Sequence, residues 1–125
     1  MKRFISTALT LIVVAVIALA GNPVITFKET THDFGNIKAT GGPVTCEYKF
    51  TNTGDAPLVI LTVSNGGCGC TTPDFPKSPI ASGKTGSIKI HFNPAGRKGE
   101  FNREVTVKTN QGKRVKLRFS GVVIP

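Results

Sequence analysis

Apolar and polar residues alternate most clearly in the segment from Val44 to Asn52. The apolar positions share one face of an extended chain and are Val44, Cys46, Tyr48 and Phe50. Threonine, glutamate and lysine occupy the positions between them. A period of two over eight residues is typical of a β-strand with one buried face. The sequence therefore predicts a half-buried strand that places Cys46 in the core.

Three later segments alternate in the same way, over residues 87–92, 101–109 and 115–123. Asn-Gln-Gly at 110–112 predicts a hairpin between the last two. Arg103 falls on the apolar positions of its segment, so we expect it near an edge or a strand end. Residues 58–63 are instead continuously apolar or β-branched. This composition predicts a strand buried on both faces or at a sheet centre.

The N-terminal part of the domain is less regular. Residues 25–27 predict a short first strand. Asp33-Phe34-Gly35 predicts a bend whose phenylalanine packs inward, with Asp33 accepting hydrogen bonds from nearby amides. Six or seven strands, short turns and no amphipathic helix after residue 20 indicate an all-β fold. We predict an immunoglobulin-like antiparallel β-sandwich of about seven strands, with a small barrel as the alternative.

Residues 1–20 have the layout of a secretory signal peptide. Lys2 and Arg3 precede an apolar run, and the alanines at 18 and 20 resemble a cleavage site before a polar break at 21–23. An uncleaved membrane anchor is the alternative, because the apolar stretch is nearly long enough to span a bilayer. We expect one domain at residues 21–125, exported to the periplasm or the cell exterior.

Charge is distributed unevenly along the chain. The formal charge of +9 falls to +7 without Lys2 and Arg3. Residues 21–76 have a net charge of −2, whereas residues 77–125 have +9. If the last three predicted strands are neighbours, their outward positions make one basic face, consisting of Lys89, His91, Lys108, Lys116 and Arg118.

A basic face would attract a protein or an anionic component of the cell envelope. A solvated surface that only keeps the protein soluble is the alternative. The sequence has no zinc-finger spacing and no basic motif rich in aromatic residues. We therefore expect no nucleic-acid partner.

The candidate functional loop is Cys68, Gly69, Cys70 and Thr71, in a glycine-rich stretch between predicted strands. In an exported protein, Cys46 is a candidate disulfide partner that would attach this loop to a core strand. A Cys68–Cys70 bond would require a tight fold at Gly69 and would be easily reduced, which suits a redox role. Three free thiols, with Cys46 as a buried hydrophobe, are a further alternative.

Metal binding and enzymatic activity have weaker support. Two thiols two residues apart could bind a soft ion such as Cu(I), with His32 or Cys46 as a further ligand. The Cys-x2-Cys spacing of zinc sites is missing, so we predict no metal and no cofactor. There is no phosphate-binding glycine loop, nucleophile elbow or His-Glu-x-x-His motif. No acid or nucleophile is evident beside His91, so we expect no catalytic residue.

Seven short motifs follow one another along the chain. They are His32-Asp33-Phe34-Gly35, Phe50-Thr51-Asn52-Thr53-Gly54, Pro57-Leu58-Val59-Ile60, Cys68-Gly69-Cys70-Thr71, Pro79-Ile80, Gly83 and Gly121-Val122-Val123. In this order they resemble the bacterial domain-of-unknown-function family 1573, over most of residues 25–124. The family pattern includes the Cys68–Cys70 loop, whereas no family cysteine is expected at Cys46.

The resemblance implies an exported seven-stranded sandwich, common in Bacteroidetes-type bacteria. The family is similar in turn to the immunoglobulin-like domains of the major-sperm-protein and ASPM-SPD-2-hydin groups. The family implies no established activity.

From the sequence we expect an exported, non-enzymatic module that contacts a protein or an envelope component through strand edges and the basic face. The alternative is a small periplasmic thiol-redox or copper-binding protein that acts through Cys68 and Cys70. A periplasmic chaperone that donates or accepts a strand is a third hypothesis.

Overall fold

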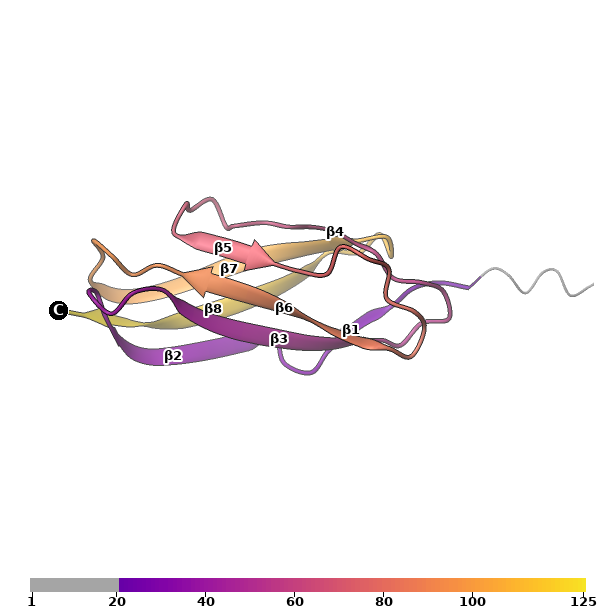
Figure 1. Ribbon diagram of the computed structural model, residues 1–125, viewed down its shortest axis with the longest axis horizontal. Coiled ribbons are helices and arrows are strands. Elements are labelled where there is room, and N and C mark those ends of the chain that lie inside the picture. Colours follow the sequence, from indigo (N-terminus) through magenta and orange to yellow (C-terminus); the bar gives the residue numbers. More distant parts are fainter. Residues whose placement is uncertain (1–20) are drawn as a thin grey trace, which may run out of the picture.

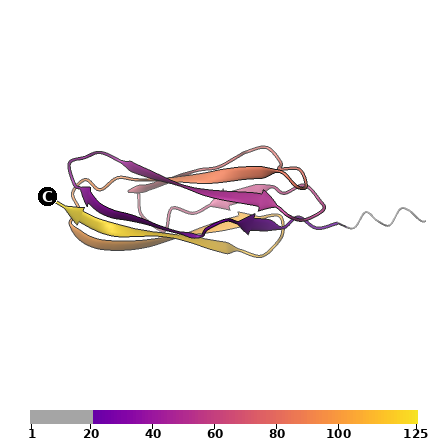
Figure 2. The same cartoon turned by 90° about the horizontal axis from the view of Figure 1, so that it is seen from below.

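The computed structural model describes residues 21–125, so the predicted signal peptide lies outside the described residues. The strands are β1 Ile25–Phe27, β2 Thr31–Lys38, β3 Val44–Asn52, β4 Ile60–Val63, β5 Thr71–Asp74, β6 Thr85–Phe92, β7 Gly99–Thr109 and β8 Val115–Ile124. They form two four-stranded sheets, β1-β3-β6-β5 and β2-β8-β7-β4. The sheets pack face to face as an elongated sandwich (Figures 1 and 2). The predicted all-β immunoglobulin-like sandwich is confirmed.

The core lies between the two sheets and follows the alternation of the sequence. On β3, Cys46, Tyr48 and Phe50 are buried, and the residues between them are exposed. The fully buried residues of the other strands include Ile88, Ile90, Phe92, Val105, Val107, Leu117 and Phe119. Burial of a side chain of this size stabilises the fold by about 1.5–3 kcal/mol. The paired inner faces therefore supply the main cohesion of the sandwich.

The segment at 58–63 is not a central strand, so that prediction was wrong. Leu58 is buried and forms an isolated bridge with Ile80, outside the named strands. Only Ile60–Val63 forms β4, which lies at an edge of the second sheet. An irregularity in the β4–β7 pairing accompanies this edge position, and Leu61 is 49% exposed. The apolar run therefore spans two settings, the isolated bridge at Leu58 and the edge strand β4, and Leu58, Ile60 and Val63 are buried in both.

The predicted bend at 33–35 lies within a strand. It is an irregularity in β2, which pairs in parallel with β8. Gly35 has a φ of 69°, in the left-handed region that favours glycine. The Gly35 N–H donates to Asp33 Oδ1 at 2.8 Å, as the sequence predicts for Asp33. Phe34 packs on the core with its ring centroid 6.0 Å from that of Phe119.

The short strand β5 is absent from the sequence prediction. It begins directly after Cys70 and pairs with β6 at the outer edge of the first sheet. It contains Pro73, which lacks a backbone N–H and is compatible with an edge strand. Within residues 21–125, no helix is long and apolar enough to cross a membrane.

Candidate functional site

The five predicted basic positions do not form one face, so that expectation was wrong. Lys89 and His91 belong to β6 in the first sheet. The remaining three residues belong to β7 and β8 in the second sheet and are Lys108, Lys116 and Arg118. Outward residues of two packed sheets point away from each other. The physical reason is that the chain crosses between the sheets from β6 to β7 instead of forming a hairpin.

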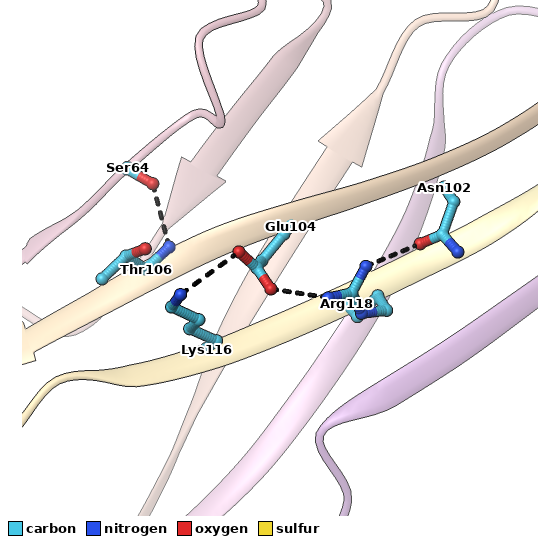
Figure 3. Close-up of polar contacts among 6 residues, drawn as sticks. All are labelled: Ser64, Asn102, Glu104, Thr106, Lys116 and Arg118. Atoms are coloured by element: carbon cyan, nitrogen blue, oxygen red, sulfur yellow. Dashed lines mark hydrogen bonds and ion pairs between the residues drawn. The ribbon is translucent and has the colours of Figure 1, made fainter.

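On the second sheet, Glu104 neutralises part of the basic charge (Figure 3). Its carboxylate lies 2.7 Å from Arg118 Nη2 and 3.7 Å from Lys116 Nζ. Arg118 Nη1 also donates to Asn102 Oδ1 at 3.1 Å. These side chains are partly exposed, and such ion pairs stabilise a protein by about 0–1 kcal/mol. The network orders the outer surface of β7 and β8 but weakens its attraction for anions.

The basic residues of the first sheet also have polar neighbours. Lys89 lies opposite Glu47 on β3 and opposite Asp74 on β5. His91 Nδ1 lies 2.8 Å from Thr45 Oγ1. Neither sheet therefore presents an uncompensated basic face built from the predicted positions.

The structure joins Cys68 and Cys70 by a disulfide in the loop between β4 and β5, with their Cα atoms 5.1 Å apart. The chain turns just before the pair, at Gly66 and Gly67, where φ is 69° and 83°. Gly69 has no left-handed φ, and a Cβ there would meet no atom within 4 Å. The chain also turns at the pair itself, because the Thr71 N–H donates to the Cys68 carbonyl at 3.2 Å across Gly69 and Cys70. The tight fold that the sequence analysis expects at Gly69 is therefore present. Closing a ring of three residues removes about 1.6 kcal/mol of chain entropy from the unfolded state, which is little for a disulfide.

The two sulfurs have different surroundings. Arg97 Nη2 donates to Cys68 Sγ at 3.0 Å, and the Cys70 N–H donates to the same sulfur at 3.2 Å. Cys70 Sγ has Thr71 Oγ1 as a polar neighbour at 3.6 Å. Cys68 is 8% exposed, whereas Cys70 is only partly buried. One sulfur is therefore enclosed by donors, and the other is more accessible.

Arg97 is the site residue that sequence reasoning missed. It lies in the turn between β6 and β7 and is separated from Cys68 by 29 positions. The two segments meet because β5 follows the cysteines and pairs with β6, so that Thr71 lies opposite Phe92. The Asn93 N–H then donates to the Cys70 carbonyl at 2.9 Å. Only the order of strands in the sheet could have indicated this meeting.

Cys46 is not bonded to the loop and is a free thiol in the described part of the chain. It is 4% exposed on the inner face of β3. Burial raises the pKa of the Cys46 thiol above its ordinary value of 9.0, and a hydrogen bond with Tyr48 offsets part of this rise. Burial, followed by the interactions with Cys46, also raises the pKa of Tyr48. The structure therefore places Cys46 as a small buried core residue.

Across residues 21–125, no three His, Cys, Asp or Glu side chains gather as a metal site would require. His32, the suggested further ligand, lies on β2 and packs edge-on against Phe34, with ring centroids 4.6 Å apart. Cys68 and Cys70 are bonded to each other. The disulfide form of the loop thus presents no thiolate for a soft metal ion.

A second feature adjoins the cysteine loop, because β7 extends beyond β4. β4 pairs with β7 only at Val107–Thr109. Ser64 continues this contact, as its N–H donates to the Thr106 carbonyl and its Oγ accepts from the Thr106 N–H, both at 2.9 Å. Within the described chain, Gly99–Arg103 is paired on the β8 side alone. Gly99–Arg103 is the β7 edge. It gives Arg103 the edge setting that its sequence position predicts.

Two residues direct their backbone groups to the free side of the β7 edge. In an antiparallel sheet, alternate residues direct their N–H and C=O groups to the same side. The groups of Thr106 point toward Ser64, so those of Asn102 and Glu100 point the same way. A Cβ on Gly66 would lie 2.6 Å from the Glu104 carbonyl oxygen, so the cysteine loop closes one end of this edge.

A hollow of about 270 Å³ lies along the β7 edge and is lined by residues 97–103 and Val123. Its charged residues are the cations Arg97, Lys98 and Arg103 and the acid Glu100. Arg97 lines this hollow and contacts Cys68, so the edge and the disulfide are neighbours.

A larger hollow of about 630 Å³ lies over the outer face of β1, β3 and β6. Its lining combines hydroxyl side chains, including Thr26, Thr51 and Ser87, with the rings of Phe27 and Phe50 and with charged residues of β3 and the segment after β1. It lies at the Gly86 end of β6, whereas the cysteine loop meets the Phe92 end. This hollow combines neither reactive groups nor the β7 edge, so it is a weaker candidate.

The comparison with protein families decides the classification. Residues 25–123 match the family described as a protein of unknown function, DUF1573. The chain belongs to the DUF1573 family. This result confirms the resemblance carried by the seven motifs. A search of curated proteins finds no match to this DUF1573 chain.

Solved structures show that other proteins share the DUF1573 fold seen here. A protein of unknown function from Porphyromonas gingivalis W83 has a TM-score of 0.69 at 16% identity, covering 81% of this chain and 47% of that one. This chain thus spans about half the length of that protein. The ASH/PapD-like domain 7 of human CEP192 has a TM-score of 0.61 at 12% identity, covering 80% and 84%. The YadV chaperone has a TM-score of 0.52 at 18% identity, covering 81% and 51%. At identities this low, the structural similarity shows a shared PapD-like, immunoglobulin-like fold and nothing more.

Proposed function

We propose that this DUF1573 protein is an exported binding module that receives an extended segment of a partner protein along the β7 edge. The observation that carries the proposal is the backbone of Glu100 and Asn102, whose groups point to a free side within the described chain. An extended peptide can add to such an edge as a further strand through main-chain hydrogen bonds. Natural proteins usually protect long free edges, so an accessible one favours a role in recognition.

The charges at the β7 edge indicate the chemistry of the partner. Arg97, Lys98 and Arg103 outnumber Glu100 in the adjoining hollow. Complementary charge speeds association and selects between partners. The segment that fits best is extended and acidic, with its side chains alternating toward and away from the hollow.

Two other sheet edges, β5 and β2, are less suited to accept a strand. β5 has four residues and includes Pro73, which removes one backbone donor. β2 has an irregularity between Asp33 and Asn36, and such bulges twist an edge away from a partner strand. β8 lies between β2 and β7, so the last strand is not free for exchange in the manner of our chaperone hypothesis.

Export is part of the proposal and rests on two observations. The apolar run and small-residue site at 1–20 have the order of a signal peptide. The Cys68–Cys70 disulfide suits an oxidising compartment such as the periplasm or the cell exterior. An envelope protein is therefore the expected source of the bound segment.

Replacing Asn102 with proline tests the β7 edge. The Asn102→Pro variant loses the N–H on the free side, while the pairing with β8 does not require that group. The probe is a phage-displayed library of random nonapeptides, selected on the purified full-length protein. We expect selected peptides to be acidic and to bind Asn102→Pro at least about tenfold more weakly, because a backbone hydrogen bond is lost and the added strand is displaced.

The matched control is Asn102→Ala, which keeps the N–H and removes only the side-chain contact with Arg118. We expect this variant to bind the selected peptides as the wild-type protein does. Equal binding to both variants and the wild type would show that the peptides use another surface. Failure to enrich any peptide would also contradict the proposal.

A further inference from the structure

The two sulfurs of the Cys68–Cys70 disulfide lie in unequal surroundings, which a purely structural disulfide does not need. Two donors, the Arg97 guanidinium and the Cys70 N–H, meet at Cys68 Sγ. Cys68 is nearly enclosed, whereas Cys70 is more accessible. Hydrogen bonds to a sulfur, one of them from a cation, favour its thiolate form once the disulfide opens. The ring of three residues also contributes little to stability, so its retention as a staple has a weak physical basis.

We propose that Cys68–Cys70 is a thiol–disulfide exchange site that oxidises cysteine thiols, with Cys70 as the attacked sulfur, Cys68 as the leaving sulfur and Arg97 as a positioning residue. This activity goes beyond the binding function proposed above and does not depend on it. The substrate class is a pair of thiols, either in one polypeptide or in two small molecules.

The exchange needs no oxidant other than the disulfide itself. A substrate thiolate attacks Cys70 Sγ, a new S–S bond forms, and the Cys68–Cys70 bond breaks. The electron pair of the broken bond goes to Cys68 Sγ, where Arg97 and the Cys70 N–H stabilise the thiolate. A second substrate thiolate then attacks the substrate sulfur of the mixed disulfide and releases the Cys70 thiolate. Two substrate thiols have then lost two electrons and two protons, and the cysteine pair has gained two electrons.

The direction of attack follows from the accessibility of the two sulfurs. A nucleophile must approach the attacked sulfur in line with the bond that breaks. The Arg97 guanidinium lies against Cys68 Sγ, whereas Cys70 Sγ has a hydroxyl as its polar neighbour. Attack at Cys70 therefore also expels the sulfur whose negative charge is better stabilised.

The first test measures the rate of reduction of the disulfide in the purified full-length protein. All variants carry Cys46→Ala, so that only the loop cysteines react, and circular dichroism confirms their fold. We expect Arg97→Gln to slow reduction by reduced glutathione by about tenfold, since a charge-assisted hydrogen bond to the leaving sulfur is lost. Arg97→Lys keeps the positive charge and should restore part of the rate. Equal rates for all three proteins would overturn the role of Arg97.

The second test identifies the attacked sulfur and the type of substrate. The reaction of the protein that carries only Cys46→Ala with glutathione is quenched by acid. Peptide mass spectrometry then locates the glutathione adduct. We expect the adduct on Cys70, and an adduct mainly on Cys68 would contradict the proposed polarity.

A synthetic peptide with two cysteines is compared with glutathione at equal thiol concentration. Faster oxidation of the peptide would indicate a polypeptide substrate, because its second thiol resolves the mixed disulfide intramolecularly. Faster oxidation of glutathione would indicate a small thiol. Oxidation of neither within hours would overturn the exchange activity.

Discussion

Asn52 shows how much a single buried polar residue contributes at the end of the sandwich where β3 finishes. It is completely buried, and both ends of its amide are used. Nδ2 donates to the carbonyls of Ala56 and Ile80 at 2.8 and 2.9 Å. Oδ1 accepts from the backbone N–H groups of Gly54 and Val24 at 3.0 and 3.3 Å. One side chain thus fixes three chain segments around the start of the domain.

We predict that Asn52→Ala lowers the free energy of unfolding by about 3 kcal/mol, because buried backbone donors and acceptors lose their partner. Urea denaturation followed by circular dichroism measures this change. Asn102→Ala is a suitable comparison, since Asn102 is exposed and its side chain contacts only Arg118 among the hydrogen bonds described. Its expected effect is below about 0.5 kcal/mol. Equal effects would contradict the assignment of Asn52 as the buried polar centre.

At the level of the strands, the alternation of apolar and polar residues indicates which face of each strand is buried, but not which strands are neighbours in a sheet. Alternation correctly indicates the buried positions of β3, β6, β7 and β8, because packing of the two sheets requires one apolar face on each strand. It does not indicate which sheet a strand joins. The predicted basic face failed for this reason, since β6 and β7 lie in different sheets. The contact of Arg97 with Cys68 was missed for the same reason.

Short edge strands were also beyond sequence reasoning. β5 is four residues long, contains a proline and directly follows the cysteines, so it has the composition of a loop. β4 belongs to an apolar run but pairs on one side only. Its apolar character reflects contact with the core at Ile60 and Val63, and not a central position. The β7 edge arises from the mismatch in length between β4 and β7, which no local pattern records.

Two contacts of the β8 residue Arg118 allow a comparison of buried and exposed interactions. Tyr48 on β3 donates its hydroxyl to the Arg118 carbonyl at 2.6 Å and links the two sheets. Glu104 pairs with the Arg118 side chain on the outer surface (Figure 3). We predict that Tyr48→Phe costs about 1–1.5 kcal/mol of unfolding free energy, whereas Glu104→Gln costs less than about 0.5 kcal/mol. Urea midpoints compare the two, and a larger loss for Glu104→Gln would contradict this ranking.

At the scale of the molecule, the described core contains two groups whose ionisation opposes folding. Burial raises the pKa values of Cys46 and Tyr48 above their ordinary values of 9.0 and 10.0. Their neutral forms are thus favoured in the folded state, and this contribution to stability is complete below pH 9. As the pH rises further, the unfolded chain loses protons that the folded chain retains, so stability falls.

We therefore predict a smaller urea midpoint at pH 10 than at pH 8. The Cys46→Ala variant should show a weaker decrease over this range, because one of the two groups is removed. Urea titrations of both proteins at fixed ionic strength measure the difference. A pH-independent midpoint for the wild-type protein would contradict the burial of these groups as ionisable core residues.

The two candidate sites share one end of the sandwich. The Phe92 end of β6 meets Thr71 of β5 and Val44 at the start of β3. The described chain enters at the opposite end, where the Asn22 N–H donates to Asp55 Oδ1 at 2.8 Å, after the end of β3. Figure 1 shows the C-terminus and the β6–β7 turn together at the first of these ends. In a chain held at its N-terminus, binding and thiol exchange would both occur at the far end of the domain.

The free strand edge on β7 can be tested without any partner by residue-resolved amide hydrogen exchange. Phe101 and Arg103 direct their N–H groups toward β8, whereas those of Glu100 and Asn102 face the free side. We predict that the latter two amides exchange roughly a hundredfold faster or more, because unpaired backbone needs little opening free energy. An acidic peptide that joins the edge should then slow exchange at Asn102. Equal protection of all four amides in the free protein would contradict the free edge and the function proposed from it.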